Sequence, residues 1–189
     1  MTKVAITGGI GTGKSYVCAL LRKHGIQVYD CDAGAKRLMR SSMTIRRQLC
    51  QLVGEEVYQN GILQKQVLAS FLLQSHEHAL AIDEIVHPAV ARDFESSGMD
   101  WIESAIFFDS GFWQRVSVDK VVCVTAPLEV RLHRIMERDH ITREKAMAWV
   151  QRQWPQEDVV AHSDFEIVND GQCDLEEQID LLLKTIYKK

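Results

Sequence analysis

The sequence lacks the cysteine patterns of disulfide-stabilised and zinc-binding proteins. Its cysteines are odd in number, widely spaced and never arranged as CxxC: Cys18, Cys31, Cys50, Cys123 and Cys173. Secreted scaffolds and structural zinc sites need paired or closely spaced thiols. We therefore expect reduced thiols.

Long apolar runs and an excess of positive charge are also missing. No stretch of 18 apolar residues occurs, and the first residues, MTKVAITGG, hold only a short apolar run. These features argue against a membrane span and a signal peptide, so we expect a cytoplasmic protein. The net charge of −4 gives no footprint for nucleic acid or an anionic membrane.

Short apolar runs alternate instead with longer segments of helical period, which is typical of a parallel α/β sheet. The pattern predicts strands at 3–7, 26–30, 104–109, 120–126 and 165–169, and helices at 14–24, 33–50, 63–80, 87–97, 128–138, 142–152 and 174–187. Pro88 and Pro127 are placed where helices can begin, and Gly25 and Gly54 where helices can end.

The interval between the second and third predicted strands is too long for a simple crossover and reads as almost wholly helical. We therefore expect an α/β fold in which residues 1–31 and 104–189 form a five-stranded parallel core flanked by helices. Residues 32–103 would form a helical insertion, and residues 131–153 a small helical lid.

The strongest local signal is the stretch from Gly8 to Ser15, which matches G-x-x-x-x-G-K-[ST] between a strand and a helix. Glycines in such a loop let backbone N–H groups converge on phosphate oxygens, and the helix adds its positive end. The loop is predicted to bind ATP and Mg²⁺, with Lys14 on the β and γ phosphates and Ser15 on the metal. The expected nucleotide-binding residues are Gly8, Gly9, Ile10, Gly11, Thr12, Gly13, Lys14, Ser15 and Tyr16.

Other P-loop classes fit less well. No N-K-x-D motif for reading guanine is present, and 189 residues are too few for a large mechanical ATPase. A small phosphoryl-transfer enzyme becomes the leading class.

Three acids follow predicted strands. Asp30 and Asp32 end the second strand, where a carboxylate can orient an attacking hydroxyl or merely cap a helix. Asp109 ends the third, where it can hold Mg²⁺ through water or simply face solvent.

Five arginines lie on the two helices of the predicted lid. They are Arg131, Arg134, Arg138, Arg143 and Arg152. Lid arginines stabilise the charge on a transferring phosphoryl group, but some of the five can instead pair with Glu129, Glu137 and Glu144 on a solvated face. Because they flank the turn, Arg138 and Arg143 are the lid candidates.

Taken together, the motifs resemble the dephospho-coenzyme A kinase family over nearly the whole chain. The matching segments are ITGGIGTGKS, GIQVYDCDAGAK, His87-Pro88, RIMERDHITREKA with Gln153 after it, and SDFEIVNDG. The resemblance implies transfer of the ATP γ-phosphoryl group to the 3′-hydroxyl of dephospho-CoA, the last step of coenzyme A synthesis.

The resemblance also implies roles for individual residues. Asp32 looks like the catalytic carboxylate, Arg138 like a lid arginine on the phosphates, and Asn169 like part of the adenine side. The insertion looks like a substrate domain in which Lys36, Lys65 and His87 contact the acceptor. Lys36 and Lys65 stand where the family usually has arginine, and Asp109 stands where it often has glutamate. A lysine replaces a bidentate arginine poorly.

Two alternatives remain at this stage. One is another small-molecule P-loop kinase, such as a nucleoside monophosphate kinase. The other is a nucleotide-binding regulator without turnover, whose signature would be loss of Lys14 or Asp32; both are present. For any of these we expect a small-molecule ligand and a monomer or weak homo-oligomer.

Overall fold

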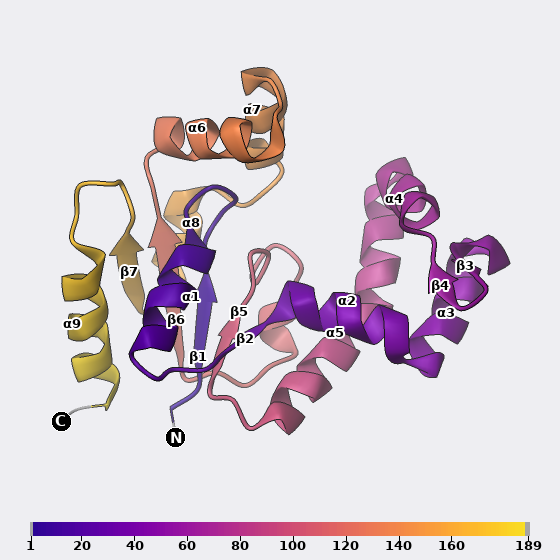
Figure 1. Cartoon of the computed structure of the whole chain (residues 1–189), viewed down its shortest axis with the longest axis horizontal. Helices are drawn as coiled ribbons and strands as arrows, with labels where there is room; N and C mark the ends of the chain where they lie inside the picture. Colours follow the sequence, from indigo (N-terminus) through magenta and orange to yellow (C-terminus); the bar gives the residue numbers. More distant parts are fainter. Residues whose placement is uncertain (1, 188–189) are drawn as a thin grey trace. The chain divides into compact units, whose positions relative to one another are not determined.

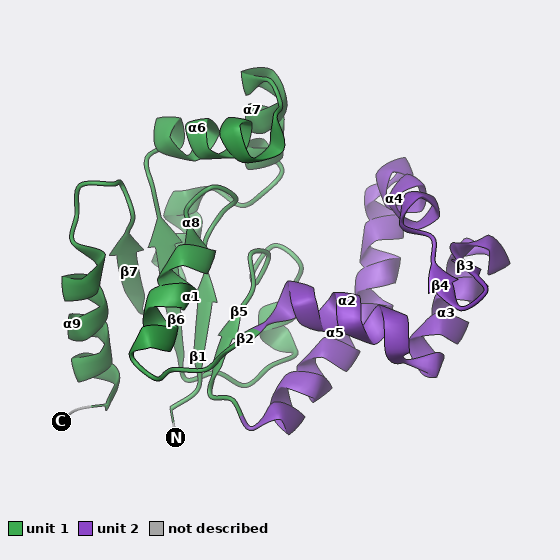
Figure 2. Cartoon of the chain, in the orientation of Figure 1, with its two compact units in different colours: residues 1–29, 99–189 green, residues 30–98 purple. Residues whose placement is uncertain are grey.

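The computed structural model describes residues 2–187, and the chain divides into two compact units (Figure 2). One unit comprises Met1–Tyr29 and Met99–Lys189, and the other comprises Asp30–Gly98. The sequence placed these limits at 32 and 103; the assignment of the second unit to substrate binding stays a prediction. None of the helices in the described residues is long and apolar enough to cross a membrane.

The first unit is built on a five-stranded sheet in the order β2-β5-β1-β6-β7 (Figure 1). The strands are β1 (Val4–Thr7), β2 (Val28–Asp30), β5 (Trp101–Glu103), β6 (Lys120–Thr125) and β7 (Phe165–Val168). Strand β1 pairs in parallel with β5 and β6, and β6 pairs in parallel with β7. Every residue of β1 is buried, as expected for the centre of a parallel sheet covered on both faces. The predicted fold class, an α/β parallel sheet flanked by helices, is confirmed.

Helices and one helical hairpin complete this unit. They are α1 (Lys14–Lys23), α6 (Leu128–Asp139), α7 (Arg143–Gln151), α8 (Gln156–Ala161) and α9 (Leu175–Tyr187), with a 3₁₀ turn at Phe112–Gln114. Leu21 of α1 and Ile179 of α9 pack with Ile6 and Trp101 of the sheet in one core. The α6–α7 hairpin has a small core of its own, formed by Leu132, Ile135 and Ala146. Pro127 precedes α6 directly, as predicted.

The second unit is mainly helical. It contains α2 (Cys31–Ser41), α3 (Met43–Val53), a 3₁₀ turn (Glu55–Val57), the hairpin strands β3 (Tyr58–Gln59) and β4 (Ile62–Leu63), α4 (Lys65–Gln74) and α5 (His76–Ser97). Its buried side chains include Ile45, Leu49 and Phe94. The Tyr58 hydroxyl donates a hydrogen bond to the Met39 carbonyl at 2.5 Å and ties the hairpin to α2.

Two serines explain why the predicted helices of this unit are divided differently. Ser42 accepts a hydrogen bond from the Ile45 amide at 3.3 Å, so α3 starts there and the predicted helix 33–50 is split. Ser75 accepts one from the His78 amide at 3.1 Å, which ends the predicted helix 63–80 and starts α5. Such caps satisfy amides that have no partner within the helix. The β3–β4 hairpin of this unit and helix α8 of the first unit were not predicted from the sequence.

The predicted helix start at His87 and Pro88 is wrong, because both lie inside α5. The helix begins twelve residues before Pro88, at His76, and buries Ile82 and Val86 ahead of the proline. An interior proline removes one backbone hydrogen bond, and the burial of this helix face offsets that loss.

The predicted strand at 104–109 is also wrong. Strand β5 is Trp101–Glu103, and residues 105–110 form turns. The apolar residues in this stretch pack with one another: the Phe107 ring lies edge to face with Phe108 and Phe112, at centroid distances of 5.2 and 6.3 Å.

Replacing Phe94 by alanine is expected to destabilise the second unit. Phe94 is fully buried on α5, and a cavity of this kind costs about 3–5 kcal/mol. Urea unfolding monitored by circular dichroism measures the loss. Leu73→Ala is the control, because Leu73 is 74% exposed and its removal should change stability by less than about 0.5 kcal/mol. Equal effects of the two variants would contradict this description of the core.

Candidate active site

The loop between β1 and α1 has a backbone that only glycine adopts readily. Gly8, Gly11 and Gly13 have positive φ values of 139°, 81° and 87°. A Cβ atom on Gly8 would collide with the Val124 carbonyl oxygen, and one on Gly13 would collide with the side-chain nitrogen of Asn169. Glycine is therefore required at these positions both by the backbone conformation and by the atoms that lie close to the chain.

The carbonyl groups of this loop are turned toward donors from the surrounding protein. The Gly9 carbonyl accepts from Thr12 Oγ1 at 2.9 Å and from Lys14 Nζ at 3.3 Å. The Ile10 carbonyl accepts from Arg131 Nε at 2.9 Å. The carbonyls of the next two residues accept from Arg134 Nη1, both at 3.4 Å.

Several amides of the same loop are left for a ligand. Within residues 2–187, the amides of Gly11, Gly13 and Ser15 have no protein acceptor. Gly13 is the N-cap of α1, so these groups lie at the positive end of a helix. Converging amides at a helix N-terminus form an anion-binding site.

Two buried cations add positive charge at the loop. Lys14 is 8% exposed and Arg131 is 5% exposed. Burial lowers the pKa of Arg131, but a guanidinium remains charged in proteins. Burial also raises the pKa of the nearby Cys123 thiol to about 12, which keeps this group neutral. The local field therefore favours an anion, although the whole chain is acidic.

Asn169 is the predicted residue that the fold brings closest to the loop. It follows β7, is buried, and donates from Nδ2 to the Thr12 carbonyl at 2.8 Å. Its own carbonyl and side-chain oxygens accept from Arg134 at 3.0 and 3.3 Å. Asn169 and Arg134 thus form one hydrogen-bonded group against the loop.

The two predicted lid arginines lie on the surface of the α6–α7 hairpin. Arg138 donates to Asp139 at 3.0 and 2.7 Å. Arg143 makes a two-pronged pair with Glu129 at 2.7 and 2.6 Å, which lowers the pKa of Glu129 and raises that of Arg143. Their side chains are 61% and 50% exposed. Their roles at phosphate stay predictions.

Sequence reasoning did not single out Arg131, Arg134 or Gln153, although these three contact the loop. Gln153 accepts a hydrogen bond from the Ile10 amide at 2.6 Å. The apolar residues Leu132 and Ile135 mark the buried side of α6, but Arg138 follows Ile135 by three residues and shares that side, so the pattern did not separate the arginines. Nothing in the pattern marked Gln153 beyond its place in the family motif.

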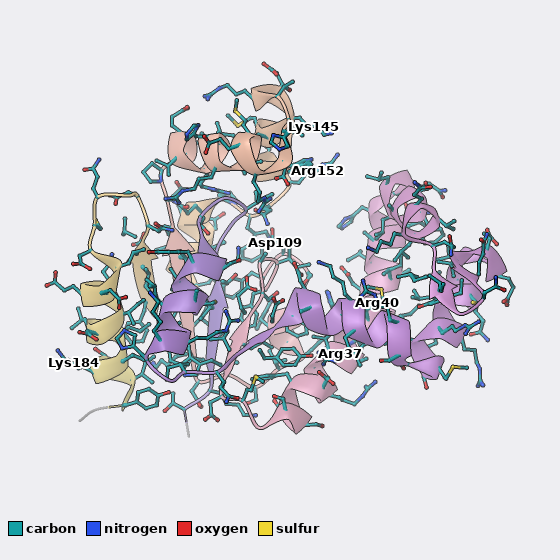
Figure 3. All side chains as sticks on the ribbon, in the orientation of Figure 1. Arg37, Arg40, Asp109, Lys145, Arg152 and Lys184 are labelled. Carbon is teal, nitrogen blue, oxygen red and sulfur yellow. The ribbon has the colours of Figure 1, made fainter. Side chains whose placement is uncertain are left out.

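Asp109 lies on the loop that follows β5 rather than at a strand end (Figure 3). Its Oδ1 accepts a hydrogen bond from the Trp154 amide at 2.6 Å. This bond links the loop to the chain that leaves α7. The predicted metal role is not tested by this contact and stays a prediction.

In the second unit the acids at the start of α2 differ in what they do. Asp30 is the N-cap and accepts from the Ala33 amide at 2.8 Å. Asp32 lies in the first turn, is exposed and has no partner among the described residues. Lys36 is exposed one turn later on the same face, and Arg40 follows on α2 (Figure 3). On this face, helix α2 therefore carries one acidic side chain, Asp32, followed by two basic ones, Lys36 and Arg40.

The remaining predicted residues of this unit lie on α4 and α5. Lys65 is the first residue of α4 and is exposed. His87 Nε2 lies 3.3 Å from Asp83 Oδ1, one turn earlier on α5. Both residues stay predicted substrate contacts.

Gly13→Ala is expected to weaken binding of Mg·ATP by more than tenfold. The new methyl group would displace Asn169 and strain the start of α1. Isothermal titration calorimetry measures the affinity. Gly98→Ala is the matched control, because Gly98 also has a positive φ, of 72°, but no atom within 4 Å of a new Cβ, and it follows α5, outside the loop and the Asn169 segment. Comparable losses in both variants would show that a general effect of backbone strain, not the collision with Asn169, decides the result.

Comparisons with known proteins agree with this geometry. The sequence model of dephospho-CoA kinase matches residues 2–174. A dephospho-CoA kinase from Bacteroides fragilis is 40% identical, covering 99% of this chain and 94% of its own length. The crystal structure of TT1252 from Thermus thermophilus superposes with a TM-score of 0.82 at 30% identity, covering 99% of this chain and 96% of that one.

A dephospho-CoA kinase structure from Campylobacter jejuni shares the fold, with a TM-score of 0.67 at 19% identity and coverage of 98% and 97% of the two chains. The family match favours the first of the three sequence-based readings over another small-molecule kinase or a regulator. The chain belongs to the dephospho-CoA kinase family.

Proposed function

We propose that this protein transfers the γ-phosphoryl group of ATP to the 3′-hydroxyl of dephospho-CoA in the cytoplasm. The observation that carries the proposal is the phosphate loop: its carbonyls are bound by protein donors, the amides of Gly11, Gly13 and Ser15 have no acceptor among the described residues, and the buried Lys14 adds positive charge. Membership of the family identifies the acceptor. The ligands are small molecules, and we propose a monomer or weak homo-oligomer without nucleic acid or membrane partners.

In this reaction the acceptor hydroxyl oxygen attacks the γ-phosphorus, the bond from that phosphorus to the bridging oxygen of ADP breaks, and the hydroxyl proton leaves. The loop amides and Lys14 hold the β and γ phosphates of the nucleotide in place. Asp32 orients the hydroxyl and takes its proton late in the transfer. The protein contributes mainly positioning and electrostatic stabilisation.

The start of α1 fits a hard cation. Ser15 is exposed beside the loop amides, and Mg²⁺ usually binds through one or two protein oxygens together with nucleotide phosphates. A metal held there would supply positive charge against the nucleotide phosphates. We propose Ser15 as its ligand, with Asp109 as a water-mediated one.

The surface arginines of the hairpin suit a role on phosphate. Exposed ion pairs such as Arg138 with Asp139 contribute about 0–1 kcal/mol, so a phosphate group can replace the carboxylate at low cost. We propose that Arg138 and Arg143 bind the transferring group in this way, with Asn169 on the adenine side. Lys36, Lys65 and His87 are proposed contacts of dephospho-CoA.

A coupled ADP-release assay with Mg·ATP tests the acceptor and the role of Asp32 together. We expect turnover with dephospho-CoA and none with AMP, CMP or shikimate. Asp32→Asn should lower kcat by about 10²- to 10⁴-fold, the contribution of a positioned acid or base, without weakening ATP binding.

Asp30→Asn is the matched control, because asparagine also caps a helix, and this variant should keep near-normal kcat. Turnover of AMP in place of dephospho-CoA would reverse the assignment in favour of a nucleoside monophosphate kinase. No turnover with any of the four acceptors would favour a regulator.

Ser15→Ala is expected to raise the Mg²⁺ concentration needed for half-maximal activity by about tenfold, since one inner ligand is lost. Asp109→Asn should raise it by a smaller factor while its amide oxygen still accepts from the Trp154 amide. Magnesium titrations at saturating ATP give both values. An unchanged requirement in Asp109→Asn would remove Asp109 from the metal site and leave it as a structural link.

A further inference from the structure

Both polar groups of the Ile10 backbone are held by side chains from the α6–α7 hairpin. The Ile10 amide donates to Gln153 Oε1 at 2.6 Å, and the Ile10 carbonyl accepts from Arg131 Nε at 2.9 Å. Other carbonyls of the loop are bound by Thr12, Lys14, Arg134 and Asn169. Hydrogen bonds with Gln153 and Arg131 therefore fix both the amide and the carbonyl of Ile10, at the middle of the phosphate loop.

The two side chains come from opposite ends of the hairpin. Arg131 lies at the end of the first turn of α6, and Gln153 lies two residues after α7 ends. They converge at Gly9, where a Cβ atom would collide with Arg131 Nη2 and lie 3.2 Å from Gln153 Oε1. The base of the hairpin therefore closes around the loop, while Arg138 and Arg143 lie farther along the hairpin.

The chain after Gln153 is fixed by two more hydrogen bonds. The Trp154 amide donates to Asp109 at 2.6 Å, and Gln156 Oε1 accepts from the Ala126 amide at 3.2 Å. The Trp154 ring stacks on Phe108, with ring centroids 5.8 Å apart. Gln153 therefore extends from an anchored segment, which lets its side chain fix the position of a loop peptide.

We propose that Arg131 and Gln153 are positioning residues that hold the phosphate loop in its ligand-binding conformation and align the γ-phosphoryl group for transfer. The proposal rests on the proposed kinase function. Neither residue is assigned a contact with substrate: both act through the Ile10 peptide. Because a displacement of about 1 Å at a reacting group can cost about 10²-fold in rate, their loss should lower turnover strongly.

Gln153→Ala is the first test. We expect kcat to fall about 10- to 100-fold, the affinity for Mg·ATP to fall severalfold, and the KM for dephospho-CoA to stay within about twofold. Gln151→Ala is the matched control, because Gln151 is exposed, lies two residues away and has no partner among the described residues. It should behave as wild type.

Gln153→Glu separates a positioning role from a general structural one. The carboxylate still accepts from the Ile10 amide, and the neighbouring Arg131 guanidinium offsets its charge, so kcat should recover at least fivefold over Gln153→Ala. No recovery, or a kcat in Gln153→Ala equal to that of Gln151→Ala, would overturn the proposal. A fall in kcat matched by an equal fraction of unfolded protein would also overturn it.

A double-mutant cycle with Arg131→Met tests whether the two residues act as one unit. Residues that hold the same group give strongly non-additive effects. The kcat of the double variant should therefore be no more than about threefold below that of the less active single variant. If the two single losses in kcat multiply instead, the residues have independent roles. The Gln153 series decides the matter alone if Arg131→Met does not fold.

Calorimetry with Mg·ATP makes the test independent of the acceptor. If wild type does not turn over dephospho-CoA, the proposed function fails. A severalfold loss of Mg·ATP affinity in Gln153→Ala, with none in Gln151→Ala, would still support the positioning role of Arg131 and Gln153. Equal affinities in Gln153→Ala, Gln151→Ala and wild type would contradict it.

Discussion

The orientation of the peptide groups in the phosphate loop is the constraint on which the rest of the first unit depends. A loop that binds an anion through its amides must turn its carbonyls elsewhere, and buried carbonyls need donors. Here the donors are Thr12, Lys14, Arg131, Arg134 and Asn169. Three of the five come from outside the motif, so the glycine-rich sequence is necessary for this geometry but does not suffice for it.

The parallel sheet explains how residues far apart in sequence become these donors. The loop follows β1, α6 follows β6, and Asn169 follows β7, and the carboxyl ends of parallel neighbours lie at one edge of a sheet. The register that pairs Thr7 with Cys123 and Thr125 with Val168 sets the height of each connection. A buried network of this kind is stable only when each member is satisfied.

The parts that the sequence predicted well are those in which local pattern and tertiary contact agree. The loop, β1 and α1 were predictable because the glycine spacing and the flanking apolar runs both indicate a phosphate loop between a strand and a helix. The segment 104–109 was not, because an apolar run of this length fits a strand as well as an aromatic cluster, and only packing of Phe107 with Phe112 decides. Likewise, five arginines spaced along two helices did not show that Arg131 would be buried and Arg138 exposed until α6 docked.

The same docking explains how an acidic chain provides a site for a polyanion. Charges on exposed surfaces are screened within about 8–10 Å at physiological salt, whereas buried charges are screened much less. Lys14 and Arg131 are buried against loop carbonyls, whose dipoles offset part of the cost of removing these cations from water. The neutral Cys123 thiol adds no opposing charge. The net charge of −4 therefore describes the chain as a whole, while the field at the loop is dominated by Lys14, Arg131 and Arg134 together with the N-terminal end of α1.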